Sequence, residues 1–306
     1  MTATATIKAT ADSRRRVTGA AAVLGAAALW GTVGPAQVLA SSAADPGALG
    51  VARLLLGGFA LAALCAGGAV WRLVVRREVF GWILLAAAAT GVYQVTFMHA
   101  VDRLGAALGT TVALGVAPVA TGLCARWWTR ERLTPGWVAG TVAAVLGCAV
   151  LLSPWQSPAD GLGVGVALLS GTCYGVYTVA AKRFLQAGAP ALPATTLTLL
   201  LAGLALSPIL VLRPGHLTDV NSLSLIAWTS VAGTAVAYAA FVYGLDRTSA
   251  PTAGTLSLAE PLLAAALGIL VLGEQLTLPV LLGCLVLISG LVTVTVMDSR
   301  LRSRSR

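Results

Sequence analysis

The sequence predicts an all-α polytopic membrane protein, in which ten transmembrane helices form two inverted five-helix repeats. Three observations lead to this prediction. Of the 306 residues, 58% are apolar and 10% are charged, and the mean hydropathy is +0.88, which is outside the range of soluble domains. Apolar runs of about twenty residues, enough to cross a hydrocarbon core about 30 Å thick, recur along nearly the whole chain. One stretch of sequence also occurs twice.

The duplicated stretch contains a proline, a glutamate, a Leu-Thr pair and two glycines at one fixed spacing. The first copy holds Pro118, Glu131, Leu133, Thr134, Gly140 and Gly147, and the second copy, 143 residues later, holds Pro261, Glu274, Leu276, Thr277, Gly283 and Gly290. At an offset of 144 residues, Phe97 also pairs with Phe241 and Asp102-Arg103 with Asp246-Arg247. So many matches at fixed positions indicate an internal duplication.

Hydropathy and helix breakers place the ten spans in chain order. The expected spans are 18–40, 47–70, 79–100, 104–126, 135–153, 161–181, 191–212, 223–244, 249–272 and 278–297. The first span follows three arginines and superficially resembles a secretory signal peptide. Because its Trp30-Gly31 has a counterpart 144 residues on in Tyr174-Gly175, we expect a retained helix that belongs to the repeat.

The spans divide the chain into five parts. These are a basic N-terminal segment (1–17), a first repeat of five helices (18–153), a linker loop (154–160), a second repeat of five helices (161–297) and a basic tail (298–306). Each repeat has an odd number of spans, so the second is expected to sit inverted relative to the first.

Charge predicts the orientation in the membrane. Of the 20 lysines and arginines, 17 fall on one side of the predicted topology. Because positively charged loops stay in the cytoplasm, we expect both termini to be cytoplasmic. The expected location is the plasma or inner membrane of the cell. The loop around Glu131 is rich in arginine, whereas the loop around its mate Glu274 has no lysine or arginine, as an inverted repeat requires.

Several kinds of chemistry are excluded by the composition. The five cysteines lie in apolar runs without ligand spacing and there are only two histidines, so we expect no metal site and no cofactor. The net charge of +9 is explained by the topology, and no nucleic-acid partner is expected.

These motifs resemble the EamA family of the drug/metabolite transporter superfamily. The resemblance covers nearly the whole chain and is carried by Ser257–Pro261 with Gly273–Thr277 and, in the first half, by Val116–Pro118 with Thr129–Glu131. It implies a secondary transporter of amino acids, related metabolites or amphiphilic compounds, mostly an exporter. It also implies a cavity lined by the first, third and fourth helices of each half.

Polar and aromatic residues within the spans are the candidates for substrate binding. They are Trp30, Gln94, His99, Tyr174, Tyr238 and Glu260. Aromatic faces with amide and phenol groups suit an amphiphilic ligand, although Tyr93 and His99, near a span end, are equally well read as interfacial anchors.

Glu260 is the carboxylate expected well inside a span, where an ionisable group is costly and is a functional candidate by default. It could bind a substrate amine or exchange a proton, or it could simply close the break made by Pro261. Arg53 is expected to reach the lipid headgroups or Asp45, with recruitment of an anionic substrate group as the alternative.

The repeated prolines and glutamates are expected to shape the helices. Pro118 and Pro261 each predict a helix break, which is either a cavity-lining hinge or a static kink. Glu131 and Glu274 are expected to bind exposed amides at the start of the next helix.

We therefore expect a secondary transporter, exporting small metabolites by alternating access around a central cavity. The alternatives are an integral membrane enzyme and a channel-like facilitator, but the chain has no GxxxxGK[ST], HExxH or GxSxG motif. The expected partners are the lipid bilayer and a small-molecule substrate. Substrate identity, proton coupling and the choice between monomer and homodimer stay open.

Overall fold

The fold is a bundle of α-helices in a computed structural model that describes residues 2–65, 68, 70–73, 76–153, 160–212 and 216–304. Side chains are described only within 14–296, Trp71 excepted. The expected linker loop lies outside the described residues, except for Asp160. The side chains of most of the basic N-terminal segment and of the basic tail also lie outside them. No strand occurs in the part of the chain that the structure describes.

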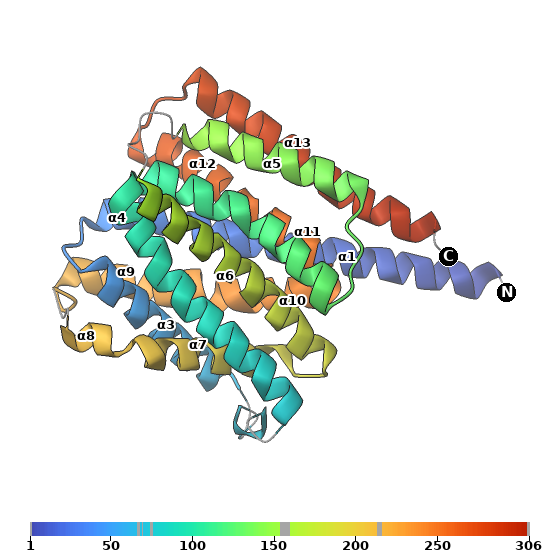
Figure 1. The fold of residues 1–306 in the computed structure, drawn as a ribbon, viewed down its shortest axis with the longest axis horizontal. Coiled ribbons are helices and arrows are strands. Elements are labelled where there is room, and N and C mark those ends of the chain that lie inside the picture. Colours follow the sequence, from blue (N-terminus) through green and yellow to red (C-terminus); the bar gives the residue numbers. More distant parts are fainter. Residues whose placement is uncertain are drawn as a thin grey trace.

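The helices follow one another with short connections (Figure 1). They are α1 (Thr2–Gly31), α2 (Val33–Ala40), α3 (Pro46–Ala63), α4 (Arg77–Trp128), α5 (Pro135–Leu152), α6 (Gly161–Gln186), α7 (Ala191–Leu206), α8 (Pro208–Leu212), α9 (Val220–Ser230), α10 (Ala237–Arg247), α11 (Ala250–Leu256), α12 (Glu260–Leu272) and α13 (Leu278–Arg304). A π-helix (Val231–Val236) joins α9 to α10, and a 3-10 turn (Ser257–Ala259) joins α11 to α12. A further 3-10 turn covers Trp71–Leu73.

Within the described residues, nine helical stretches are long and apolar enough to cross a membrane. The longest is α4 with 52 residues, which is interrupted by non-helical backbone at Gly105 (φ 77°, ψ 163°). The chain folds back there, and Gly109 packs against the backbone of Ala100 (Figure 1). The spans expected at 79–100 and 104–126 are therefore the two arms of one helical hairpin with a single-residue hinge.

Helix starts are set by side chains that accept hydrogen bonds from the first free amides. Asp45 accepts from the amide of Ala48 at 3.0 Å, and Thr134 accepts from the amide of Trp137 at 3.1 Å. A proline follows each capping residue, at the position where a helix does not need its missing N–H.

Asp160 caps α6 in the same way and also pairs with Arg103, next to the turn in α4. The hydrogen bond from Arg103, followed by those from the amides of Gly163 and Leu162, lowers the pKa of the Asp160 carboxyl. This contact ties the start of α6 to the hairpin turn of α4.

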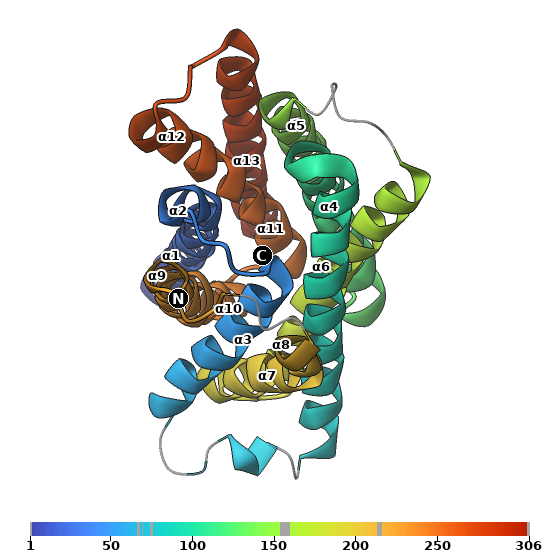
Figure 2. The ribbon, with the colours of Figure 1, turned by 90° about the vertical axis from the view of Figure 1, so that its left-hand side faces the viewer.

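The glycines of the duplicated stretch lie where its two copies meet. Gly140 and Gly147 on α5 pack against Gly290 and Leu287 on α13, and the two helices run side by side (Figure 2). Small residues allow this close approach, because helices in lipid associate through packing rather than through the hydrophobic effect. The repeat therefore supplies the contact surface between α5 and α13.

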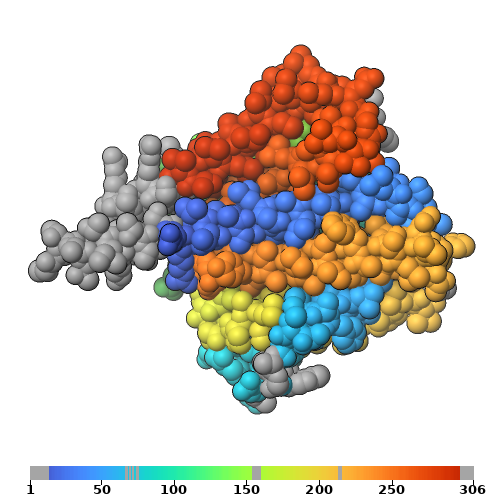
Figure 3. Space-filling view, turned by 180° about the vertical axis from the view of Figure 1, so that it is seen from behind, coloured from blue at the N-terminus to red at the C-terminus, as the bar shows by residue number. Residues whose placement is uncertain are grey.

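Besides Gly105, irregular backbone occurs at the α1–α2 break, which contacts both the 3-10 turn and the π-helix. Gly31, at the end of α1, packs directly against the backbone carbonyl of Glu260, next to the 3-10 turn. Gly233 of the π-helix faces Val33 of α2, just beyond the α1–α2 break. The space-filling view shows α1 lying between the α9–α10 stretch and the α12–α13 stretch (Figure 3). Large apolar side chains such as Leu270 and Val211, both 81% exposed, cover the outside of the bundle, as expected of surfaces that face lipid.

Candidate functional site

An aromatic cluster joins α1, α4, α6 and α10. Trp30 of α1 makes ring contacts with Tyr174 of α6 at 6.3 Å, with Tyr238 of α10 at 5.6 Å and with Phe241 at 5.4 Å, measured between centroids. Tyr93 of α4 lies 6.1 Å from Tyr174. We use the name aromatic cluster for Trp30, Tyr93, Phe97, Tyr174, Tyr177, Tyr238 and Phe241.

The cluster lies within the membrane-length apolar stretches and away from their ends, with Trp30 in Arg14–Ala40, Tyr174 in Gly161–Gln186 and Tyr238 in Val220–Arg247. Tyr174 comes 13 residues after the start of α6, which corresponds to about 20 Å at about 1.5 Å per residue. Trp30 and Tyr174 are partly exposed, whereas Tyr238 is buried at 8% exposure. The rings of Trp30 and Tyr174 are therefore not fully covered by other parts of the protein.

Arg53 adds a positive charge at this depth. Its Nη2 donates a hydrogen bond of 2.8 Å to Oε1 of Gln94, whose side chain is only 7% exposed. The expectation that Arg53 reaches the headgroups or Asp45 is therefore wrong, because the guanidinium turns inward to α4 while Asp45 caps α3.

Glu260 adds the negative charge. It is the first residue of α12, directly after the 3-10 turn, and it is partly buried. Its carboxyl interacts electrostatically with Arg53 and with the phenols of Tyr93, Tyr174 and Tyr238. Opposite charges and aromatic rings thus share one region.

Ser257 links the 3-10 turn to the aromatic cluster. The hydroxyls of Ser257 and Tyr174 lie 2.6 Å apart, and Ser257 also donates to the carbonyl of Ala253 at 3.0 Å. The sequence analysis overlooked Ser257 and Tyr177. Spacing could have pointed to both, because Tyr177 lies one helical turn after Tyr174 and Ser257 lies three residues before Glu260.

The structure brings five of the six predicted substrate-binding residues together: Trp30, Gln94, Tyr174, Tyr238 and Glu260. His99 lies apart from them. It is exposed on α4, with Nδ1 2.8 Å from the carbonyl oxygen of Val95, and it lines a separate groove of about 340 Å³ between α3, α4 and the α7–α8 segment. Gln94 also borders that groove.

The repeated prolines differ in their effect. Pro118 is buried within the second arm of α4, whose backbone stays helical through it, so the helix is not interrupted there, and a hinge or static kink at Pro118 stays a prediction. Pro261 is the second residue of α12 and directly follows the 3-10 turn. Only the second copy of the duplicated stretch therefore combines its proline with irregular backbone.

The repeated glutamates also occupy different surroundings. Oε2 of Glu131 accepts a hydrogen bond of 3.0 Å from the amide of Ala250, which begins α11 in the other half of the chain. The amides of the next helix are capped by Thr134 instead, so the partner expected for Glu131 was wrong. Glu274 is exposed and lies against Gly268 of α12, the helix before it.

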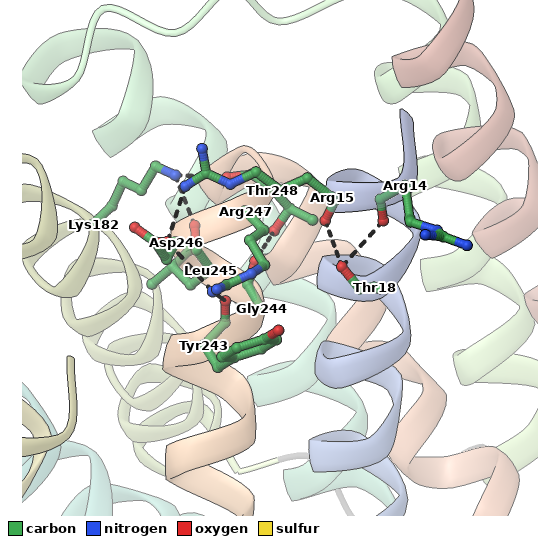
Figure 4. Close-up of polar contacts among 10 residues, drawn as sticks. All are labelled: Arg14, Arg15, Thr18, Lys182, Tyr243, Gly244, Leu245, Asp246, Arg247 and Thr248. Atoms are coloured by element: carbon green, nitrogen blue, oxygen red, sulfur yellow. Dashed lines mark hydrogen bonds and ion pairs between the residues drawn. The ribbon is translucent and has the colours of Figure 1, made fainter. Parts of the chain in front are cut away.

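Polar contacts close one end of the bundle around the turn between α10 and α11 (Figure 4). Lys182 of α6 donates to the carbonyls of Leu245 and Thr248, both at 2.7 Å, and Arg15 of α1 pairs with Asp246 at 3.1 Å. We name these contacts, with the hydrogen bond from Ala250 to Glu131, the basic-end clamp. A cation suits the carbonyls at the end of α10, and a carboxylate suits the amides at the start of α11.

Among the described residues, no group of three or more His, Cys, Asp or Glu side chains could hold a metal ion. A helical bundle with membrane-length apolar helices, and with charges and aromatic rings at mid-depth, has the features of a multi-pass membrane transporter.

The chain belongs to the EamA-like transporter family, whose model matches residues 17–153 and again residues 161–296. It is 34% identical over 284 residues to the uncharacterized transporter YwfM of Bacillus subtilis, a match that covers 89% of this chain and 92% of that protein. It is 33% identical over 212 residues to the threonine/homoserine exporter RhtA of Escherichia coli, which covers 68% of each chain. A solved crystal structure with 21% identity aligns with a TM-score of 0.80 over 94% of this chain, which shows the fold.

Proposed function

We propose that this protein is a secondary transporter that exports small metabolites, such as amino acids or related amphiphilic compounds, through the bilayer. The observation that carries the proposal is the joint position of Glu260, Arg53 and the aromatic cluster at mid-depth. Ionisable groups inside a membrane bundle mark substrate or ion pathways, because their desolvation is too costly to persist without a use. The kinship with RhtA, named as an amino-acid exporter, supports the substrate range.

The proposed mechanism is alternating access in a fold of two inverted repeats. In this proposal the two arms of α4 are separate crossings, which gives ten crossings in all, and both termini face the cytoplasm. The basic-end clamp then lies on the cytoplasmic side and keeps that side closed in the present conformation. Export requires the clamp to open, so that a substrate can reach Glu260 from the cytoplasm.

A flux assay in sealed liposomes tests the proposal. Purified protein would be challenged with labelled amino acids and amphiphilic amines, with and without a proton gradient. Saturable movement of an unchanged solute is the expected result, and dependence on the gradient would reveal proton coupling. Chemical conversion of the solute would support a membrane enzyme, and flux without saturation would support a channel-like facilitator; either result would overturn the proposal.

A further inference from the structure

Arg53 is a charge at a depth where charge is costly. It lies seven residues after the first residue of α3, about 10 Å into the span at about 1.5 Å per residue. A guanidinium has five N–H donors, and the amide of Gln94 takes one of them. The remaining donor capacity is available for an anionic group.

Glu260 is the opposite charge in the same region, yet the two side chains do not touch. They interact electrostatically, but no ion pair of 4.0 Å or less joins these two described residues. A desolvated pair is stabilised well only in direct contact, so a gap leaves both charges poorly compensated. Arg53 lies on α3 and Glu260 lies on α12.

Two tyrosines lie within electrostatic reach of both charges. Tyr93 of α4 and Tyr238 of α10 each interact electrostatically with Arg53 and with Glu260. Trp30 contacts Tyr238 at 5.6 Å, which adds an indole face to these tyrosines. A ligand between the two charges would therefore also meet aromatic rings.

We propose that Arg53 and Glu260 together recognise a zwitterion, with Arg53 binding its carboxylate and Glu260 its ammonium group. This inference rests on the proposed transport function and narrows the substrate class to solutes that carry both charges a few atoms apart. Such a solute compensates both protein charges at once. Arginine suits the carboxylate because its planar donors match two carboxylate oxygens, and the aromatic faces add attraction for the ammonium group.

Equilibrium binding to the purified protein tests this assignment with matched probes. The probes are threonine and phenylalanine, their methyl esters, which lack the carboxylate, and their N-acetyl forms, which lack the ammonium group. We expect the wild-type protein to prefer at least one free amino acid over both of its derivatives by about ten- to a hundredfold, the usual range for a charge-assisted hydrogen bond.

Two variants test the contribution of each charge to binding separately. Arg53→Gln should lose the preference over the ester while still binding the ester as the wild type does, which also shows that it is folded. Glu260→Gln should lose the preference over the N-acetyl form. The control Arg103→Gln removes an exposed arginine that pairs with Asp160 and should keep both preferences.

Two results would overturn the inference: an Arg53→Gln variant with the wild-type preference, or a wild-type protein that binds esters as tightly as free amino acids. Failure to bind any of the probes would also overturn it. In that case the proposed transport function is judged separately, by whether the flux assay finds another solute that moves.

Discussion

Gln94 holds the charge at the centre of the protein in place. Its amide oxygen accepts a hydrogen bond from Arg53, and its side chain is nearly buried. Gln94 also lines the groove that contains His99. Because hydrogen bonds to charged groups contribute about 1.5–3 kcal/mol, we expect this contact to orient the Arg53 guanidinium.

Replacing Gln94 with leucine should therefore weaken substrate binding by about tenfold or more, since Arg53 loses its fixed partner. The measurement is the substrate dissociation constant of the purified variant. Gln37→Leu, which changes an exposed glutamine on α2, is the matched control and should bind as the wild type does. Equal affinity of the two variants would show that Gln94 does not position Arg53.

The sequence indicated which residues within the membrane spans could bind substrate. It indicated less well where their side chains point. Glu260 was selected because it is the carboxylate expected well inside a span, where an ionisable group is costly. Arg53 was placed at the membrane surface because a long side chain near a helix end usually reaches outward, whereas here Gln94 on the neighbouring helix α4 accepts its hydrogen bond. Such contacts between helices have no signal in local sequence.

At the scale of elements, the hairpin of α4 depends on Gly105. Its backbone angles lie in a region that is essentially restricted to glycine. The sequence predicted two spans here from hydropathy and a charged boundary. It did not predict that a single residue would form the turn, because a glycine can equally well serve helix packing.

Gly105→Ala should destabilise the protein by about 1–3 kcal/mol, since any Cβ is strained at these angles. The unfolding temperature in detergent measures the effect. Gly81→Ala lies in the same helix, at a position with regular backbone and no neighbour near the added methyl group, so it should be neutral or stabilising. A similar unfolding temperature for both variants would contradict the strained turn.

The basic-end clamp is the second element whose role can be tested. Lys182→Met removes the cation that joins α6 to the carbonyls at the end of α10. This end of the bundle should then open more often. In a background without the five native cysteines, Ala253→Cys, at a fully buried position on α11, should react several-fold faster with a membrane-impermeant maleimide added from that side.

Arg183→Gln is the control for this prediction, because it removes the next cation of α6, whose guanidinium lies over the Trp82 ring, 5.0 Å from its centroid, and which belongs to none of the clamp contacts. The same labelling rate in the Lys182→Met and Arg183→Gln backgrounds would show that the clamp does not hold this end closed.

At the scale of the whole molecule, the two copies of the duplicated stretch share a sequence pattern but differ in backbone around their prolines. Hydropathy and the repeat predicted a helical membrane protein and nearly all of its long helices. They did not predict that irregular backbone would gather at the α1–α2 break, the π-helix and the 3-10 turn. These features depend on packing between elements, such as the packing of Gly31 against Glu260. Pro118, in contrast, lies within a continuous helix.

Solute flux into sealed liposomes is the most direct test of the proposed role of Glu260. The proteins compared are the wild type, Glu260→Gln and the control Glu274→Gln, which changes an exposed glutamate. We predict saturable flux for the wild type and the control, and at least a tenfold loss for Glu260→Gln. Pairing with a substrate ammonium group requires the ionised carboxylate, so wild-type flux should fall as the pH is lowered, and residual flux of Glu260→Gln should lack this dependence. A Glu260→Gln variant with the wild-type rate and pH profile would contradict the central role of Glu260.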